Sequence, residues 1–247
     1  MALKTTLNYS PNFNPKKRPS KQIKFIIFHY TGMKSESIAL ERLTDIQSEV
    51  SCHYLIKNNG EIVKMVPDSY IAWHAGKSSW KSYKSLNRNS IGIEITNPGH
   101  EYGYKNFTKK QITSLLKLSK FLIKKYKISS KNILGHSDIA VLRKKDPAEK
   151  FPWEYLSKNK IGIWHTLNKQ DLTKNRKLKI DKIEENIFFR DLFKIEYPKK
   201  YPKDTSKNKY LRELAKAFQR RFRQELVDGK IDQECLIICK NLIKAYN

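Results

Sequence analysis

The alternation of apolar strand-like runs with helical patterns between residues 21 and 165 constrains the fold most. Ile23–Phe28 is a continuous apolar run, typical of a strand buried on both faces. Ser90–Ile95 alternates instead, which places its three isoleucines on one face of a strand and Gly92 and Glu94 on the other. Glu94 is therefore expected to face away from the isoleucine layer.

Three further patterns complete this part of the chain. Ser51–Val66 predicts a hairpin, because two apolar runs flank an Asn-Asn-Gly turn. Thr108 and Gln111 form a predicted capping box at the start of a helix with helically spaced apolar residues up to Tyr126. Alternating strands and helices favour an α/β fold with a mixed central β-sheet flanked by helices.

The remaining segments suggest a divided chain. Residues 1–20 contain three prolines and predict an extended N-terminal arm, and residues 21–165 would form the main domain. Residues 166–180 are polar and basic, as expected of a linker. Residues 181–247 carry three helical patterns, which indicate a small C-terminal three-helix domain.

The charge of the chain is strongly positive, with 50 Lys+Arg against 24 Asp+Glu. Such a balance can indicate an anionic partner, for example nucleic acid. Only ten of the fifty basic residues are arginine, and the lysines are scattered through every segment. A nucleic-acid interface would concentrate them and favour arginine, so we expect no nucleic-acid partner.

Compartment and cysteine use give weaker expectations. The first twenty-four residues lack the apolar core of a secretory signal, which favours the cytoplasm on this sequence, or the periplasm or envelope if a leader has been removed. No apolar run is long enough to span a bilayer. Cys52, Cys235 and Cys239 are expected to be buried small residues without a disulfide framework. The oligomeric state cannot be inferred.

Three residues at predicted strand ends or in irregular segments are candidate metal ligands: His29, His136 and Asp146. A catalytic zinc ion usually takes three protein ligands and leaves a fourth position for water. The spacing alone does not decide, because a histidine after an apolar strand is more often a structural, hydrogen-bonded residue.

Glu94 adds to the case for a catalytic site. A carboxylate inside an apolar strand costs several kcal/mol unless it is paired, solvated or functional. It is a candidate general base, and pairing with one of the many lysines is the alternative.

Six motifs then occur in an order found in one enzyme family. They are Phe28-His29-Tyr30-Thr31, Cys52-His53-Tyr54, Ala72-Trp73-His74-Ala75-Gly76, Asn89-Ser90-Ile91-Gly92-Ile93-Glu94, Gly135-His136-Ser137-Asp138-Ile139-Ala140 and Arg143-Lys144-Lys145-Asp146-Pro147. In these motifs, over about residues 20–160, the chain resembles the type 2 N-acetylmuramoyl-L-alanine amidases. That family includes muropeptide-recycling and envelope amidases, phage amidase lysozymes and peptidoglycan recognition proteins.

The resemblance implies a zinc-dependent hydrolase that cuts the amide bond between N-acetylmuramic acid, or its 1,6-anhydro form, and L-alanine. It implies that His29, His136 and Asp146 bind one catalytic Zn²⁺, that Glu94 is the base and that Lys144 stabilises the oxyanion. Ala148 departs from the glycine that the family often has after Asp-Pro, which affects only the local loop shape. A second likeness, carried by residues 217–223 and 228–232 and covering about 40 residues, is to a helical peptidoglycan-binding domain found after envelope amidases. A purely stabilising helical cap is the alternative.

Substrate contacts are less constrained by the sequence. Four residues within the motifs are candidates for them: Tyr30, Trp73, His74 and Asn89. Trp80 and Tyr83 belong to a loop that could cover the sugar and peptide, and His100 and His165 carry no motif and are expected on the surface.

Two other function classes remain at this stage. The first is a peptidoglycan-recognition module without catalysis, although such a module has no need to retain all four candidate residues His29, Glu94, His136 and Asp146. A basic nucleic-acid-binding protein is the second alternative. Intact cell wall and soluble anhydromuropeptides are equally compatible with the sequence as substrates.

Overall fold

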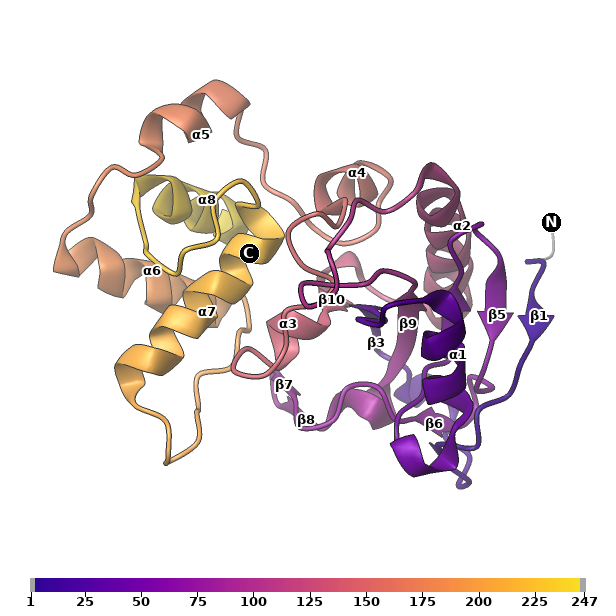
Figure 1. Cartoon of the computed structure of the whole chain (residues 1–247). Coiled ribbons are helices and arrows are strands. Elements are labelled where there is room, and N and C mark those ends of the chain that lie inside the picture. The colour runs from indigo at the N-terminus through magenta and orange to yellow at the C-terminus, as the bar shows by residue number, and fades with distance from the viewer. Residues whose placement is uncertain (1–2, 245–247) are drawn as a thin grey trace.

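A computed structural model describes residues 3–244, and a six-stranded mixed sheet forms its centre (Figure 1). β4 and β5 pair antiparallel, and the other neighbours in the sheet pair in parallel. This arrangement confirms the predicted fold class and hairpin. The strand order is β1 (Thr6–Leu7), β5 (Ile62–Lys64), β4 (Tyr54–Ile56), β9 (Ser90–Ile95), β3 (Phe25–Tyr30), β10 (Ile133–Gly135).

The two faces of this sheet pack against different partners. Ile26 and Phe28 of β3 join the isoleucines of β9 in a core that α2 (Lys109–Tyr126) covers. Phe25 and Ile27 point to the opposite face. His29 has the same parity as Phe25 and Ile27, so its side chain lies on the face away from α2. The capping box of Thr108 and Gln111 at the start of α2 is present as predicted.

Shorter elements complete the region around the sheet. α1 (Glu36–Thr44) begins at Ser35, whose hydroxyl accepts from the amide of Ile38. The other elements are β2 (Phe13–Asn14), β6 (Ile71–Ala72), β7 (Ser79–Trp80), β8 (Tyr83–Lys84), α3 (His136–Ile139), α4 (Trp153–Lys158) and 3-10 turns at Ser20–Gln22, Ile46–Ser48, Leu86–Asn89 and Ser130–Asn132. The segment between α3 and α4 contains no long regular element, as its prolines predict.

The N-terminal segment supplies one strand to the six-stranded sheet and one strand to a two-stranded sheet. β1 pairs in parallel with β5, and β2 pairs antiparallel with β6. Arg18 is buried and donates to the carbonyl oxygens of Asp68 and Ser90. Strand pairing and hydrogen bonds therefore fix residues 6–18 to the sheet region.

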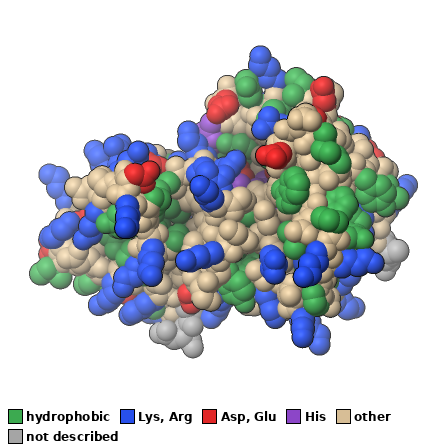
Figure 2. Space-filling model, turned by 90° about the horizontal axis from the view of Figure 1, so that it is seen from below, with side chains coloured by type: hydrophobic (Ala, Val, Ile, Leu, Met, Phe, Trp, Pro, Cys, Tyr) green, Lys and Arg blue, Asp and Glu red, His purple; other side chains and the backbone are tan. Residues whose placement is uncertain are grey.

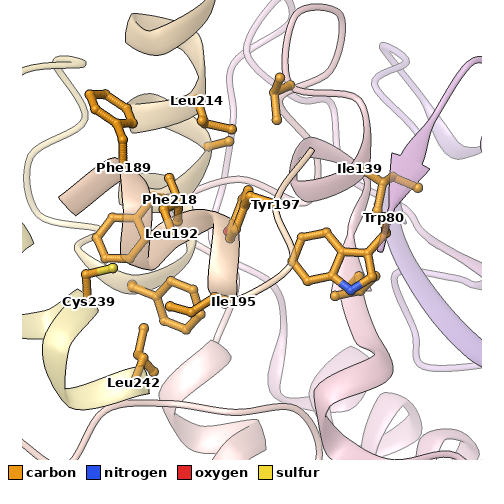
Figure 3. Close-up of a cluster of buried hydrophobic side chains, with 14 of the residues drawn as sticks. Trp80, Ile139, Phe189, Leu192, Ile195, Tyr197, Leu214, Phe218, Cys239 and Leu242 are labelled. Carbon is orange, nitrogen blue, oxygen red and sulfur yellow. The ribbon is translucent and has the colours of Figure 1, made fainter. Parts of the chain in front are cut away.

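The C-terminal helices are α5 (Lys169–Asn175), α6 (Lys182–Lys194), α7 (Lys207–Phe222) and α8 (Gln233–Lys244). The last three match the predicted helical patterns, whereas α5 lies within the segment predicted as a linker. One continuous apolar cluster joins these helices to the sheet, running from Phe189 and Leu214 through Tyr197 to Ile139 and Trp80 (Figure 3). The helical unit therefore shares its core with the sheet region.

Two other expectations concern burial and membranes. Cys52, Cys235 and Cys239 are free and buried, as predicted. Among residues 3–244, no helix combines the length and the apolar character needed to cross a bilayer.

Candidate active site

Two neighbouring parallel strands bring the first two candidate residues together. β3 and β9 pair in a register that places His29 opposite Glu94, near the carboxyl ends of both strands. Both side chains lie on the face away from α2, because the isoleucines of β9 occupy the other face. The strand alternation seen in the sequence is therefore what positions Glu94 beside His29.

His136 and Asp146 reach the same place from the edge of the sheet. His136 is the first residue of α3, directly after β10, which pairs with β3. The amide of Ser137 donates to the carbonyl oxygen of Asp146 at 2.8 Å, which holds the later loop against the start of α3.

Three donor atoms of these residues converge. His29 Nδ1 lies 2.9 Å from His136 Nδ1 and 3.0 Å from Asp146 Oδ2, and His136 Nδ1 is also 3.0 Å from Asp146 Oδ2. All three residues are buried. In a tetrahedral zinc site with bonds of about 2.0–2.1 Å, neighbouring donors lie about 3.3 Å apart, so this donor set fits such an ion with a small outward adjustment.

Hydrogen bonds behind the two imidazoles set their tautomers. His136 Nε2 lies 3.1 Å from the carbonyl oxygen of Ala75, which can only accept, so Nε2 carries the proton and Nδ1 presents a lone pair. This is the arrangement that a metal-binding histidine requires.

A chain of three hydrogen bonds sets the tautomer of His29. The Ser90 hydroxyl donates to Leu86 O at 2.6 Å and so accepts from His74 Nε2 at 3.2 Å. His74 Nδ1 must then accept from His29 Nε2 at 3.0 Å, which leaves the lone pair of His29 on Nδ1. Both histidines thus aim an unprotonated Nδ1 at the same point.

The electrostatic environment favours a neutral His29 beside an ionised Asp146. Burial, followed by the neighbouring His136, lowers the pKa of His29 to about 4. Burial alone would raise the pKa of Asp146, but His136 and His29 together hold it well below its usual value. Neutral nitrogen and anionic oxygen donors are the forms that bind a divalent cation.

Glu94 lies next to this group without belonging to it. Glu94 Oε1 is 4.0 Å from His29 Nδ1, and the side chain is 15% exposed. Within residues 3–244 its other oxygen, Oε2, is buried and has no hydrogen-bond partner. Burial, reinforced by the charge of Asp146, raises the pKa of Glu94 to about 8, while Lys144 opposes the shift. A carboxylate in this state readily takes up a proton.

A cleft opens over these groups. His74, Glu94, His136 and Asp146 line it, and so do four cationic side chains, those of Arg42, Arg143, Lys144 and Lys145. In the space-filling view, histidine side chains are recessed in a hollow of the surface with Lys and Arg beside it (Figure 2). The cleft therefore joins a donor set that fits a metal ion, a carboxylate with a raised pKa and an excess of positive charge.

The comparison with known proteins now decides the family. Residues 19–149, more than half of the chain, match the family model described as N-acetylmuramoyl-L-alanine amidase. The chain belongs to this amidase family. The N-acetylmuramoyl-L-alanine amidase AmiD of Escherichia coli is 34% identical over 237 residues, which cover 91% of this chain and 84% of that protein. The 1,6-anhydro-N-acetylmuramyl-L-alanine amidase AmpD of Haemophilus influenzae is 34% identical over 168 residues, covering 60% of this chain and 88% of that one.

Solved structures agree with this membership. The amidase superposes on E. coli AmiD, in its complex with anhydro-N-acetylmuramic acid-L-Ala-D-gamma-Glu-L-Lys, with a TM-score of 0.77 and 32% identity. That match covers 94% of this chain and 92% of the other. AMPDH3 of Pseudomonas aeruginosa, in complex with anhydromuramic pentapeptide, gives a TM-score of 0.76 and 30% identity over 94% of both chains. These matches include the C-terminal helices, because they cover nearly the whole chain.

Three of the four predicted substrate-contact residues of this amidase line the cleft, and Asn89 does not. Tyr30, Trp73 and His74 line the cleft, and His74 also supports His29. Asn89 precedes β9, at the opposite end from Glu94, and its side-chain amide donates to Gln22 O at 3.3 Å. The substrate roles of all four stay predictions.

Two expectations about other aromatic residues were wrong. Trp80 is 1% exposed and packs against Tyr197, so it cannot stack on a sugar. His165 is buried at 7% exposure, where a surface position was expected. In both cases the covering residues come from the C-terminal part of the chain, which no local pattern reveals.

One pair at the cleft was missed by the sequence reasoning. His100 is exposed as expected, yet it lines the cleft, with Nδ1 3.1 Å from the Tyr30 hydroxyl and Nε2 3.0 Å from Glu149. Glu149 follows the Asp146 loop closely, and that proximity was the available signal. The pair ties the loop carrying Asp146 to the rim beside Tyr30.

Position 92 must be a glycine because its backbone lies against the ring of His74, which supports His29. A Cβ atom at this position would lie 2.4 Å from Cγ of His74. We expect Gly92→Ala to displace His74 and to destabilise the protein by about 1–3 kcal/mol, the usual cost of overpacking. The free energy of unfolding in urea measures this. The double variant with His74→Ala should be less destabilised than the sum of the single changes, and strict additivity would contradict the proposed clash.

Proposed function

We propose that this amidase hydrolyses the bond between the lactyl carbonyl of N-acetylmuramic acid and L-alanine, with one catalytic Zn²⁺ held by His29, His136 and Asp146. The observation that carries the proposal is the convergence of three buried donor atoms within 3.0 Å of one another, beside the carboxylate of Glu94, whose Oε1 lies 4.0 Å from His29 Nδ1. Family membership supports the same reaction.

The residues around the donors then have distinct roles. When bound, Zn²⁺ would lower the pKa of a water ligand towards about 7 and so supply a nucleophile at neutral pH. Glu94 accepts a proton from the attacking water, whose oxygen bonds to the lactyl carbonyl carbon, and it returns that proton to the alanine nitrogen as the C–N bond breaks. Lys144, a cation lining the same cleft, stabilises the negative charge that develops on the carbonyl oxygen.

The charge of the cleft supports an anionic substrate. Arg42, Arg143 and Lys145 add positive charge around the reactive groups, and Glu101 is the acidic residue that lines the cleft besides Glu94 and Asp146. Stem peptides carry free carboxylates, which such cations attract. The substrates named in the related complexes are anhydromuramic peptides, and we propose this class of fragment for the present chain.

The C-terminal helices leave the choice between fragment and polymer open to experiment. We propose that residues 181–247 form the predicted peptidoglycan-binding-like unit, which favours the polymer as a second substrate. Support comes from the helices at the predicted positions and from the whole-chain match to E. coli AmiD.

The decisive experiment compares the two substrates directly. The protein is incubated with purified sacculi and with anhydromuramoyl tripeptide, before and after chelation, and the products are identified by mass spectrometry. We expect release of free tripeptide from the soluble fragment, loss of release after chelation and its return with added Zn²⁺. If neither substrate is cleaved by metal-loaded protein, the proposed reaction is wrong.

A further inference from the structure

The short helix that carries His136 depends on residues from the C-terminal part of the chain. α3 contains four residues, His136–Ile139, too few for a helix to be stable alone. Its third residue, Asp138, is fully buried. Asp138 Oδ2 accepts from the amide of Gly135 at 2.8 Å, which closes the start of α3.

Both oxygens of Asp138 also accept hydrogen bonds from distant residues. The Tyr197 hydroxyl, in the segment after α6, donates to Oδ1 at 2.7 Å. Arg221 Nη1, near the end of α7, donates to Oδ2 at 2.6 Å, and Arg221 Nη2 donates to Ile133 O of β10 at 2.9 Å. We call Asp138, Tyr197 and Arg221 the Asp138 cluster.

Packing around the cluster leaves little freedom for either donor. The Arg221 guanidinium lies over the Trp153 ring, 4.5 Å from its centroid, and the pair with Asp138 is almost fully buried. The Tyr197 ring packs edge-to-face against Trp80, with ring centroids 4.9 Å apart. Figure 3 shows the two side chains in the same apolar cluster. A buried carboxylate with charged and neutral donors at fixed positions can hold only a narrow range of orientations.

The Asp138 cluster therefore influences the position of His136, because Asp138 and His136 belong to the same short helix. Asp138 is two residues from His136 in the same turn, so a rotation of α3 that follows loss of the cluster moves His136 Nδ1 relative to His29 and Asp146. Outside the donor set, His136 Nε2 also lies 3.1 Å from Ala75 O, and the amide of Ser137 donates to Asp146 O at 2.8 Å. These contacts hold the first turn of α3 at its start, whereas the Asp138 cluster holds the helix at its third residue.

We propose that Tyr197 and Arg221 are positioning residues for His136, so that the C-terminal helical unit helps to build the metal centre. This role is separate from any contact of that unit with glycan. It rests on the proposed function, because it takes His136 to be a metal ligand.

The test uses full-length variants that change one donor each. Tyr197→Phe removes the hydroxyl and keeps the ring against Trp80, and Arg221→Lys keeps the charge but loses the two-pronged contact. Tyr54→Phe and Arg223→Lys are the matched controls. Tyr54 is a buried tyrosine that donates to the buried carboxylate of Asp68, and Arg223 is a buried arginine that pairs with Asp232.

Zn²⁺ affinity, measured by competition with a chromophoric chelator, and the visible spectrum of the Co²⁺-substituted protein are the readouts. We expect about 10–100-fold weaker Zn²⁺ binding and an altered Co²⁺ spectrum in Tyr197→Phe and Arg221→Lys, with both properties preserved in the controls. If Arg221→Lys does not fold, the milder Tyr197→Phe decides.

Two results overturn the proposal. One is native affinity and spectrum in Tyr197→Phe, and the other is equal weakening in the controls, which indicates general destabilisation. A native chain that binds no metal at all would instead overturn the proposed function, and the inference with it.

Discussion

Glu94→Gln is expected to retain Zn²⁺ and to lose about 10²–10⁴-fold in kcat, the usual contribution of a general acid–base group. Glutamine has nearly the same shape as glutamate but cannot accept the proton. Metal binding should persist because Glu94 lies outside the three donors, 4.0 Å from His29 Nδ1. Metal content by mass spectrometry and turnover of anhydromuramoyl tripeptide measure the two effects.

Glu41→Gln provides the control, since Glu41 is exposed on α1 and lines no part of the cleft. Its turnover should equal that of the native chain. Native turnover in Glu94→Gln would remove Glu94 from the reaction. Loss of metal in that variant would show that Glu94 acts through the metal site and not as a base.

The sequence predicted the position of Glu94 for a reason that is local. Successive side chains of a strand point to opposite faces, so the isoleucines of Ser90–Ile95 share one face and Glu94 lies on the other. The isoleucine face must pack against a core, and this leaves Glu94 on the opposite side. The same holds for the hairpin and for the capping box of α2. These features could be predicted because every residue that determines them lies within a few positions along the chain.

The convergence of His29, His136 and Asp146 is a different case. Nothing in their spacing brings residues 29, 136 and 146 to one point, because their meeting depends on the order of β9, β3 and β10 in the sheet. The family resemblance supplied that information. The support of His29 by His74 was missed for the same reason. His74 lies over Gly92 of β9, and it reaches His29 only because β9 pairs with β3.

Burial by the C-terminal helices was also beyond local patterns. Trp80 lies in a polar loop that suggests exposure, yet Tyr197 covers it from more than a hundred residues away. Asp138 looks like an ordinary surface carboxylate beside His136 until Arg221 and Tyr197 are placed. Predictions from sequence are therefore least accurate for residues that lie where the C-terminal helices pack against the sheet region.

Asp146→Asn is expected to weaken Zn²⁺ binding by more than about 100-fold, beyond the range usual for residues that only support a ligand. The variant keeps the size of the side chain but replaces the only anionic donor of the set by a neutral amide, a poorer ligand for a divalent cation. Competition with a chelator measures the loss. Asp68→Asn is the control, because Asp68 is equally buried and hydrogen-bonded, by Tyr54 and Tyr126, but lies outside the cleft. It should lower stability and leave the affinity for Zn²⁺ intact, whereas unchanged affinity in Asp146→Asn would exclude Asp146 as a ligand.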